Sequence, residues 1–195
     1  MTAPTPADVP VLQTASSLVE LTSDTYTRLQ RLPYAGGGTA LAPVRALLAT
    51  AVQELDRART DLARATRTAG GRVQTSPNAK YAAVVEQALP TVRGPGDVVG
   101  LLLTLEDVLA QTLVADVVDL SSPDVRVTVL GHATASARRK ALLLTLGALL
   151  STGRADLVAV PPDLVALPPG AGTVGFPDVL FPTEKASPAT EGALR

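Results

Sequence analysis

The sequence predicts an all-α fold: a four-helix bundle of two antiparallel hairpins joined by one long crossover, followed by an extended C-terminal arm. Three observations favour it. Four long segments carry apolar residues at helical spacing, Pro and Gly clusters separate these segments, and the connections differ in length. The chain has 195 residues, of which 46% are hydrophobic and only 3% aromatic. We therefore expect one domain with an aliphatic core over residues 1–153, and the arm over 154–195.

The first hairpin is predicted from helices over residues 7–32 and 41–69. In the first helix, Leu12, Val19 and Tyr26 recur at seven-residue spacing along an apolar line. A run of proline and glycine residues ends this helix. The stripe opposite the apolar line is polar and is expected to face water; it comprises Gln13, Ser17, Glu20, Asp24, Arg28 and Arg31.

The second helix shows the same repeat along an apolar line that comprises Leu48, Leu55, Leu62 and Ala69. Its outer face is charged. Residues three apart are neighbours on a helix surface, so the spacing predicts two surface ion pairs, Glu54–Arg57 and Asp61–Arg64.

A crossover rich in Pro and Gly follows over residues 70–96. Within it, residues 78–89 are expected to form a short helix with Ser76 as the N-cap. The second hairpin consists of helices over residues 97–120 and 123–152. The short connection within each hairpin makes its two helices antiparallel, whereas the crossover is long enough to run the length of the bundle.

The arm, residues 154–195, has no helical period, but it carries more apolar residues than a disordered tail would. These residues are Leu157, Val160, Leu164, Leu167, Val174, Phe176, Val179, Leu180 and Phe181. We expect residues 155–185 to be ordered and to pack on the bundle or on a partner subunit.

Composition excludes several functional classes. The chain has no cysteine, which excludes disulfides and thiolate metal sites, and its net charge of −1 offers no basic field for nucleic acid. The most apolar stretch, residues 98–118, is interrupted by Glu106, Asp107 and Asp116, so we expect no membrane span. No basic and apolar leader opens the chain, which predicts a cytoplasmic protein; export with a removed leader is the alternative.

Four segments of the chain resemble a known family. They are residues 12–18 (LQTASSL), 74–81 (QTSPNAKY), 105–112 (LEDVLAQT) and 174–192 (VGFPDVLFPTEKASPATEG). In this order they resemble the actinobacterial ferritin-like domain proteins, distant relatives of rubrerythrins and bacterioferritins. The resemblance covers nearly the whole chain and implies a ferritin-like bundle.

The resemblance also implies where a di-metal centre would lie. Such bundles use one Glu from each of two helices and a Glu-x-x-His from each of the other two. Val19 stands at the expected Glu of the first helix, and Glu20, one residue on, belongs to the polar stripe. Ala133 and Ser136 stand at the expected Glu-x-x-His of the fourth helix, and the second helix has no histidine.

Glu106 is the one carboxylate that the periodicity places on an apolar helix face; exposure at a helix edge is the alternative. Its neighbours at −7, −4, +3 and +7 are Val99, Leu102, Leu109 and Leu113. Asp107 and Gln111 belong to the polar stripe of the same helix. A buried Glu106 without metal cations would be replaceable by Gln at no cost, unless an arginine reached inward to pair with it.

The fourth helix is expected to turn a small-residue face inward, comprising Leu130, Ala133, Ala137, Ala141, Leu144 and Ala148. His132 is the only histidine of the chain. It follows from this orientation that His132 lies beside Arg139 on the outside of the helix, solvated and not bound to metal.

These residues predict a bundle that has lost its di-metal site, with no catalytic residue, metal or cofactor. The expected function is that of a non-catalytic structural or interaction protein, with homodimerisation through the arm or an apolar helix face. The alternative is a degenerate bundle that binds residual metal or a small apolar molecule in an alanine-lined centre beside Ala58, Ala133 and Ala137.

Overall fold

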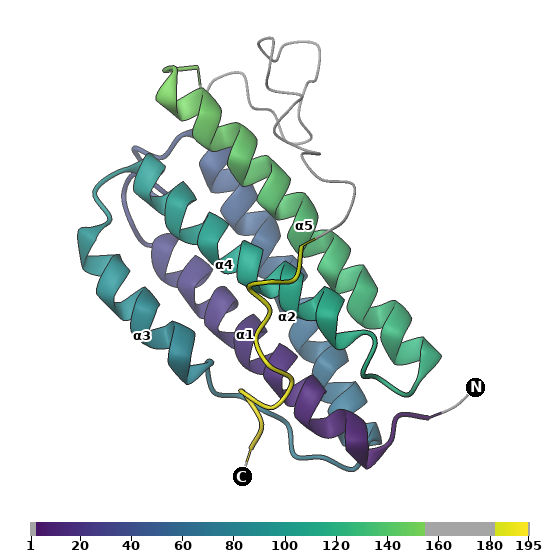
Figure 1. Cartoon of the computed structure of the whole chain (residues 1–195). Helices are drawn as coiled ribbons and strands as arrows, with labels where there is room; N and C mark the ends of the chain where they lie inside the picture. Colours follow the sequence, from purple (N-terminus) through teal and green to yellow (C-terminus); the bar gives the residue numbers. More distant parts are fainter. Residues whose placement is uncertain (1–2, 155–181, 195) are drawn as a thin grey trace.

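The computed structural model describes residues 3–154 and 182–194, and all regular secondary structure within these ranges is helical (Figure 1). The α-helices are α1 (Val9–Leu29), α2 (Ala42–Thr68), α3 (Ala79–Ala88), α4 (Pro95–Asp116) and α5 (Pro123–Ser151). Single 3-10 turns at Pro6–Asp8 and Leu89–Thr91 precede α1 and follow α3. The all-α class that the sequence predicts is therefore confirmed.

Prolines and short polar side chains set the helix starts. A proline occupies the first position of both α4 and α5, where the missing N–H has no intrahelical partner to lose. The N-cap of α3 is Asn78 and not Ser76: the Asn78 side chain accepts a hydrogen bond from the Tyr81 N–H. The Asn78 N–H itself donates to the Ser17 carbonyl of α1 at 2.9 Å, so a long-range contact decides which residue caps α3.

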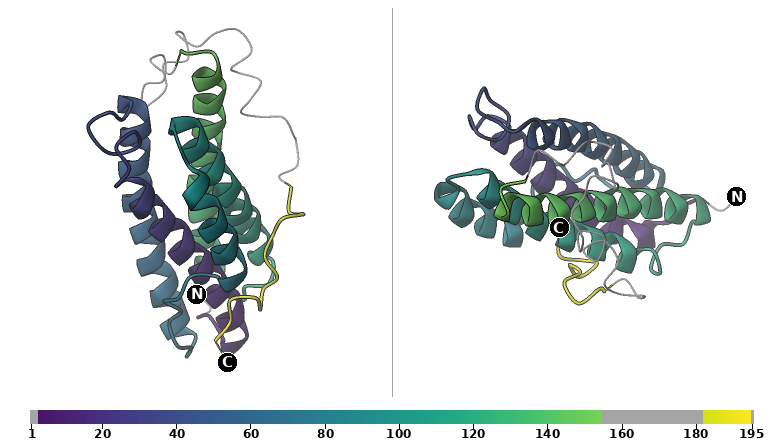
Figure 2. Two further views of the ribbon diagram at one scale, coloured as in Figure 1. Left: turned by 90° about the vertical axis from the view of Figure 1, so that its left-hand side faces the viewer. Right: turned by 90° about the horizontal axis from the view of Figure 1, so that it is seen from above.

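The four long helices form two hairpins that pack side by side. Helix α1 packs on α2 and α4, and α5 packs on α4 and α2. The helices of each hairpin are antiparallel, and the crossover returns along the bundle, so α2 and α4 run in the same direction (Figures 1 and 2). Helix α3 lies outside the four, against α1.

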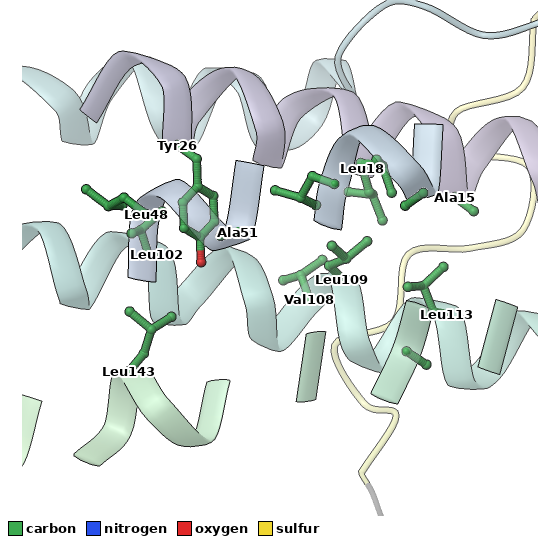
Figure 3. Packing of buried hydrophobic residues seen from close by; sticks show 14 of the residues in the cluster. Ala15, Leu18, Tyr26, Leu48, Ala51, Leu102, Val108, Leu109, Leu113 and Leu143 are labelled. Atoms are coloured by element: carbon green, nitrogen blue, oxygen red, sulfur yellow. The ribbon is translucent and has the colours of Figure 1, made fainter. Parts of the chain in front are cut away.

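Among residues 3–154 and 182–194, the fully buried side chains of the core are aliphatic except for Tyr26. All four long helices contribute fully buried leucines, and the largest fully buried side chain is Tyr26 of α1. Figure 3 shows this side chain extending from α1 towards α4. Burial of each leucine contributes about 1.5–3 kcal/mol, so the core stabilises the bundle without many aromatic residues.

Helix α5 is rotated relative to the orientation predicted from its sequence. The buried face comprises Val125, Val129, Ala133, Ser136, Arg139, Leu143, Leu146 and Leu149. Of the predicted inner face only Ala133 is buried, and Leu130 is 43% exposed. The helix is apolar on both sides, so its periodicity gave no reliable direction; the choice of face depends on what α2 and α4 present to it.

Helix α4 is the one helix of the described residues that is long and apolar enough to cross a membrane. However, 67% of its most apolar 18-residue window is buried inside the bundle. Core helices of helical bundles meet the same criterion of length and composition.

The C-terminal segment, residues 182–194, lies against α1 and α4 (Figure 1). It covers Gln13 and Ser17, which are therefore buried, although the sequence pattern predicts that they face water. Glu20 of the same polar stripe turns to α2, where it pairs with Arg59 at 2.6 Å. The predicted solvent-facing stripe of α1 is thus wrong for Gln13 and Ser17, because periodicity does not reveal a cover from the far end of the chain. It is confirmed for Asp24 and Arg31, which are exposed.

The polar stripe of α4 is corrected in the same way, since Asp107 and Gln111 are buried beneath the C-terminal segment. The apolar residues of the arm from Leu157 to Phe181, and the predicted order of residues 155–181, lie outside the described residues.

Candidate functional site

A buried carboxylate, Glu106 of α4, lies at the centre of the bundle and is 0% exposed. It does not lack a cation. Arg139 of α5 donates from Nε to Glu106 Oε1 at 2.7 Å and from Nη2 to Oε2 at 3.0 Å. This is the two-pronged geometry in which a planar guanidinium matches a carboxylate best.

Two hydroxyl groups complete the hydrogen bonding of this carboxylate. The Tyr26 hydroxyl of α1 donates to Glu106 Oε1 at 2.9 Å, and Ser136 Oγ of α5 donates to Oε2. Burial, and then the neighbouring Glu106 carboxylate, raises the pKa of Tyr26 well above its usual value. Tyr26 therefore stays a neutral donor, and both oxygens of Glu106 are satisfied.

The same guanidinium reaches a second carboxylate. Arg139 Nη1 donates to Glu54 Oε2 of α2 at 2.8 Å, and Arg138 pairs with the other Glu54 oxygen. The predicted Glu54–Arg57 surface pair is therefore wrong, because Glu54 turns inward to α5 and leaves Arg57 exposed. The other predicted pair, Asp61–Arg64, is present.

These contacts form what we call the central cluster: Tyr26, Glu54, Glu106, Ser136 and Arg139. All four long helices contribute to it. Burial disfavours the charge of Arg139, but the Glu106 carboxylate outweighs burial and raises the pKa of Arg139 above its usual value. The guanidinium is therefore a permanent cation held between carboxylates of α2 and α4.

His132 is half-buried and not solvated, so the prediction from the sequence is wrong. Its side chain is 16% exposed, and Nε2 lies 3.1 Å from Asp61 Oδ2 of α2. Burial lowers the pKa of His132 below its usual value, against the opposing charge of Asp61. The rotation of α5 explains the error, because it turns His132 and Arg139 towards α2.

The centre of the bundle leaves almost no free space. A cavity of about 10 Å³ lies between α1, α2, α4 and α5, and it is lined by Val19, Glu54, Leu55, Ala58, Leu109, Leu113, His132, Ala135 and Arg139. This volume is about the minimum that one water molecule needs.

The residues at this centre do not fit a di-metal site. Val19, Ala133 and Ser136, which stand where the resemblance implies metal ligands, are all buried, and two of them have no donor atom in the side chain. Nowhere in residues 3–154 and 182–194 do three His, Asp or Glu side chains come together as a ligand set. The Arg139 guanidinium lies between the two available carboxylates, where it would repel a metal cation and could not ligate one.

One signal in the sequence could have identified Arg139. Ser136 and Arg139 are three residues apart, so they share a face of α5, and Ser136 was already placed inward by the resemblance. A buried Glu106 needs a cation, and the next helix offers Arg138, Arg139 and Lys140 in succession. Only the arginine that shares the face of Ser136 can reach it.

A wider hollow of about 350 Å³ opens on the surface where α2 and α5 meet the N-terminal residues. It is lined by Ala3, Pro4, Asp61, Arg64, Ala65, Thr68, Ser122, Asp124, Val125 and Thr128. Asp61 already pairs with Arg64 and His132, so the opposite charges that α2 contributes to the lining are used within the protein.

The comparisons with known proteins give no relative from which a function could be transferred. No family model, no curated protein and no solved structure matches this chain.

Proposed function

We propose that this protein is a ferritin-like bundle in which the ion pairs of Arg139 replace a di-metal centre, and that it serves as a non-catalytic structural or interaction module. The observation that carries this proposal is the Arg139 guanidinium between Glu54 and Glu106. The four resembling segments and the arrangement of two hairpins with a long crossover support the ferritin-like part.

Charge balance explains how the bundle holds together without metal. In a di-metal bundle, the cations offset the carboxylates that the helices direct inward. Here Arg138 and Arg139 offset Glu54 and Glu106, and the hydroxyl of Tyr26 fills a remaining acceptor position. Unlike a metal, a guanidinium has no open coordination position at which a substrate could bind.

The cluster also lacks the features of a catalytic site. A general base needs a free lone pair within reach of a substrate, but both Glu106 oxygens accept hydrogen bonds inside the core. The adjoining cavity of about 10 Å³ has no room for a substrate. The alternative function, binding of a small apolar molecule at an alanine-lined centre, is disfavoured for the same reason, because ligand pockets span roughly 300–1,000 Å³.

Metal titration tests the proposal directly. We expect that Fe(II), Mn(II) and Zn(II), added under anaerobic conditions, bind below one equivalent per chain and leave the melting temperature unchanged. Binding of two metals per chain with a raised melting temperature would overturn the proposal.

A restoration variant tests the ferritin-like part separately. We expect the combination Val19→Glu, Ala133→Glu, Ser136→His and Arg139→Leu to bind metal, because it removes the guanidinium and returns ligands to the matching positions. Arg139→Leu alone is the matched control. A restoration variant that is helical by circular dichroism but takes up no more metal than this control would contradict the ferritin-like assignment.

A further inference from the structure

The C-terminal segment is held by its backbone at six points. Gln111 Oε1 accepts from the Lys185 N–H at 2.8 Å, and Thr112 Oγ1 accepts from the Ser187 N–H at 2.8 Å. These two bonds fix the first half of the segment on α4. Both acceptors are side chains of the bundle and not backbone groups.

The second half of the segment is held by α1 and the crossover. The Thr14 hydroxyl donates to the Ala189 carbonyl at 2.8 Å and accepts from the Gly192 N–H at 3.0 Å. Gln74 Nε2 donates to the Gly192 carbonyl at 2.9 Å, and Gln13 Oε1 accepts from the Leu194 N–H at 2.9 Å. We call the set Gln13, Thr14, Gln74, Asp107, Gln111 and Thr112 the docking surface.

The docking surface also discriminates between side chains. At one end, Lys185 Nζ lies 2.6 Å from Asp107 Oδ2, which provides a charge-assisted contact for a lysine. At the other end only glycine fits: a Cβ at Gly192 would lie 2.2 Å from Ser17 Oγ and 2.8 Å from the Thr14 Cα. A peptide with turns at residues 184–185 and 189–192 is therefore recognised by a lysine and, seven residues later, a glycine.

The segment contributes little to the hydrophobic core. Among its described residues only Ala189 packs against the core cluster. The receiving side chains stand on α1, α4 and the crossover, and the leucine core packs α1 and α4 together. Undocking the segment would therefore exchange hydrogen bonds for water without opening the bundle.

We propose that the docking surface is a peptide-binding site, that residues 185–194 are its tethered ligand, and that it accepts the same segment from a second copy of this chain. This proposal does not rest on the central cluster or on the ferritin-like assignment. The segment belongs to the same polypeptide as the docking surface, so its own copy competes with a segment from a second chain as an intramolecular ligand. A second copy docks when that competition is removed.

A labelled peptide tests the site. Full-length chain carrying Gly192→Val keeps the docking surface but disables its own segment. We expect a fluorescent peptide of residues 183–195 to bind this variant at least tenfold more tightly than it binds the wild-type chain, as measured by fluorescence anisotropy. Equal binding to both chains, or no binding to the variant, would overturn the proposal.

Matched changes separate docking from unspecific adhesion. A peptide that itself carries Gly192→Val should not bind, whereas a peptide with Thr190→Ala should bind like the wild type because Thr190 is exposed. Adding Thr14→Val to the Gly192→Val chain should weaken peptide binding at least tenfold. Helical content by circular dichroism verifies that each variant is folded.

A complementation experiment tests docking of a second copy. A Gly192→Val chain has an intact surface, and a Thr14→Val chain has an intact segment. We expect an equimolar mixture to form a heterodimer in analytical ultracentrifugation, with no such increase in either chain alone. Peptide binding without heterodimer formation would refute the second-copy part and leave the site itself standing.

Discussion

Glu106 and Asp107 are consecutive carboxylates of α4 that lie in opposite surroundings. Glu106 points into the bundle and meets the planar guanidinium of Arg139. Asp107 belongs to the docking surface and pairs with Lys140 and Lys185, the latter with 65% of its side chain exposed. Neighbouring residues of α4 thus form two kinds of ion pair. The buried pair Glu106–Arg139, called the dry pair, costs much to break, whereas the partly exposed pair Asp107–Lys185, called the wet pair, costs little.

The largest expected effect comes from removing the cation of the dry pair. Arg139→Met leaves Glu106 buried without a counter-charge, so we expect the free energy of unfolding to fall by about 3–5 kcal/mol. Denaturant unfolding at pH 7 measures this. Arg138→Met is the control: its side chain is 60% exposed, and we expect a loss below about 1 kcal/mol.

The reverse change sharpens the same comparison. From sequence alone, Glu106→Gln is expected to be neutral, but the pairing with Arg139 implies a loss of more than about 2 kcal/mol. The double variant Glu106→Leu with Arg139→Met should recover much of either single loss, because it removes both buried charges together. Additive losses in the double variant would show that the two side chains do not act as a pair.

The fold and the site differ in how far the sequence predicts them. Seven-residue leucine spacing and prolines at helix starts are local signals, and they placed the ends of the four long helices to within a few residues. The burial of Glu106 was also readable, because its apolar neighbours lie on the same helix. Its partner Arg139 does not follow from the periodicity of α5, which is apolar on both sides; only the spacing of three residues from Ser136 indicates it.

The docking surface was hidden from local patterns for a different reason. Gln13 and Gln111 look like solvent-facing residues when each helix is considered alone. They are buried because a segment about 75 to 180 residues further along the chain covers them. Periodicity indicates whether a helix face is polar. It does not indicate whether the polar side chains of that face form hydrogen bonds with water or with a peptide backbone.

A third carboxylate of α4 has neither kind of partner. Asp116 is buried, and its Oδ2 atom has no hydrogen-bond partner among the described residues. Burial, and then the charge of Asp119, raises the pKa of Asp116 to about 8. The folded state therefore holds this proton more tightly than the unfolded state, whose pKa is near 3.8. The associated stability is fully present below about pH 4 and is lost as the pH rises through about 8.

Asp116→Asn should remove the loss of stability that the wild type suffers as the pH rises, because Asn does not titrate. We expect the wild type to lose at least about 1 kcal/mol relative to the Asn variant between pH 5 and pH 8.5, since each unit of pKa shift corresponds to about 1.4 kcal/mol. Thermal unfolding of both proteins measures this difference in stability. The titration of His132 cancels in the difference, because both proteins contain His132. Parallel pH profiles would show that Asp116 has a partner or is solvated.

Tyr26→Phe tests the neutral donor to the dry pair. It removes one hydrogen bond to Glu106 but leaves the guanidinium in place, so we expect a loss of about 1–1.5 kcal/mol. Denaturant unfolding measures it. In an Arg139→Met background the loss should be larger, because the hydroxyl is then among the few donors left to Glu106. A smaller loss of unfolding free energy in that background would mean that Tyr26 and Arg139 do not stabilise the Glu106 carboxylate together.

The smallest effect is expected for the wet pair. Although burial alone would raise it, hydrogen bonds from Lys140, Lys185 and Gln111 lower the pKa of Asp107 to about 2. The folded state therefore releases this proton more readily than the unfolded state, so the stability is present above about pH 4 and is lost as the pH falls towards 2. Because Lys185 is mostly exposed, solvent screens the pair, and we expect Asp107→Asn to cost about 1 kcal/mol or less at pH 7.

Salt separates the wet pair from the dry one. Raising the ionic strength from about 0.05 M to 1 M shortens the screening length to about 3 Å, so the cost of Asp107→Asn should shrink by about half. The cost of Arg139→Met should stay nearly constant over the same range, because solvent ions do not enter the bundle centre. If Asp107→Asn were instead as costly as Arg139→Met and equally insensitive to salt, the C-terminal segment would be part of the core. The C-terminal segment could then not be regarded as a ligand that is separable from the bundle centre around Glu106.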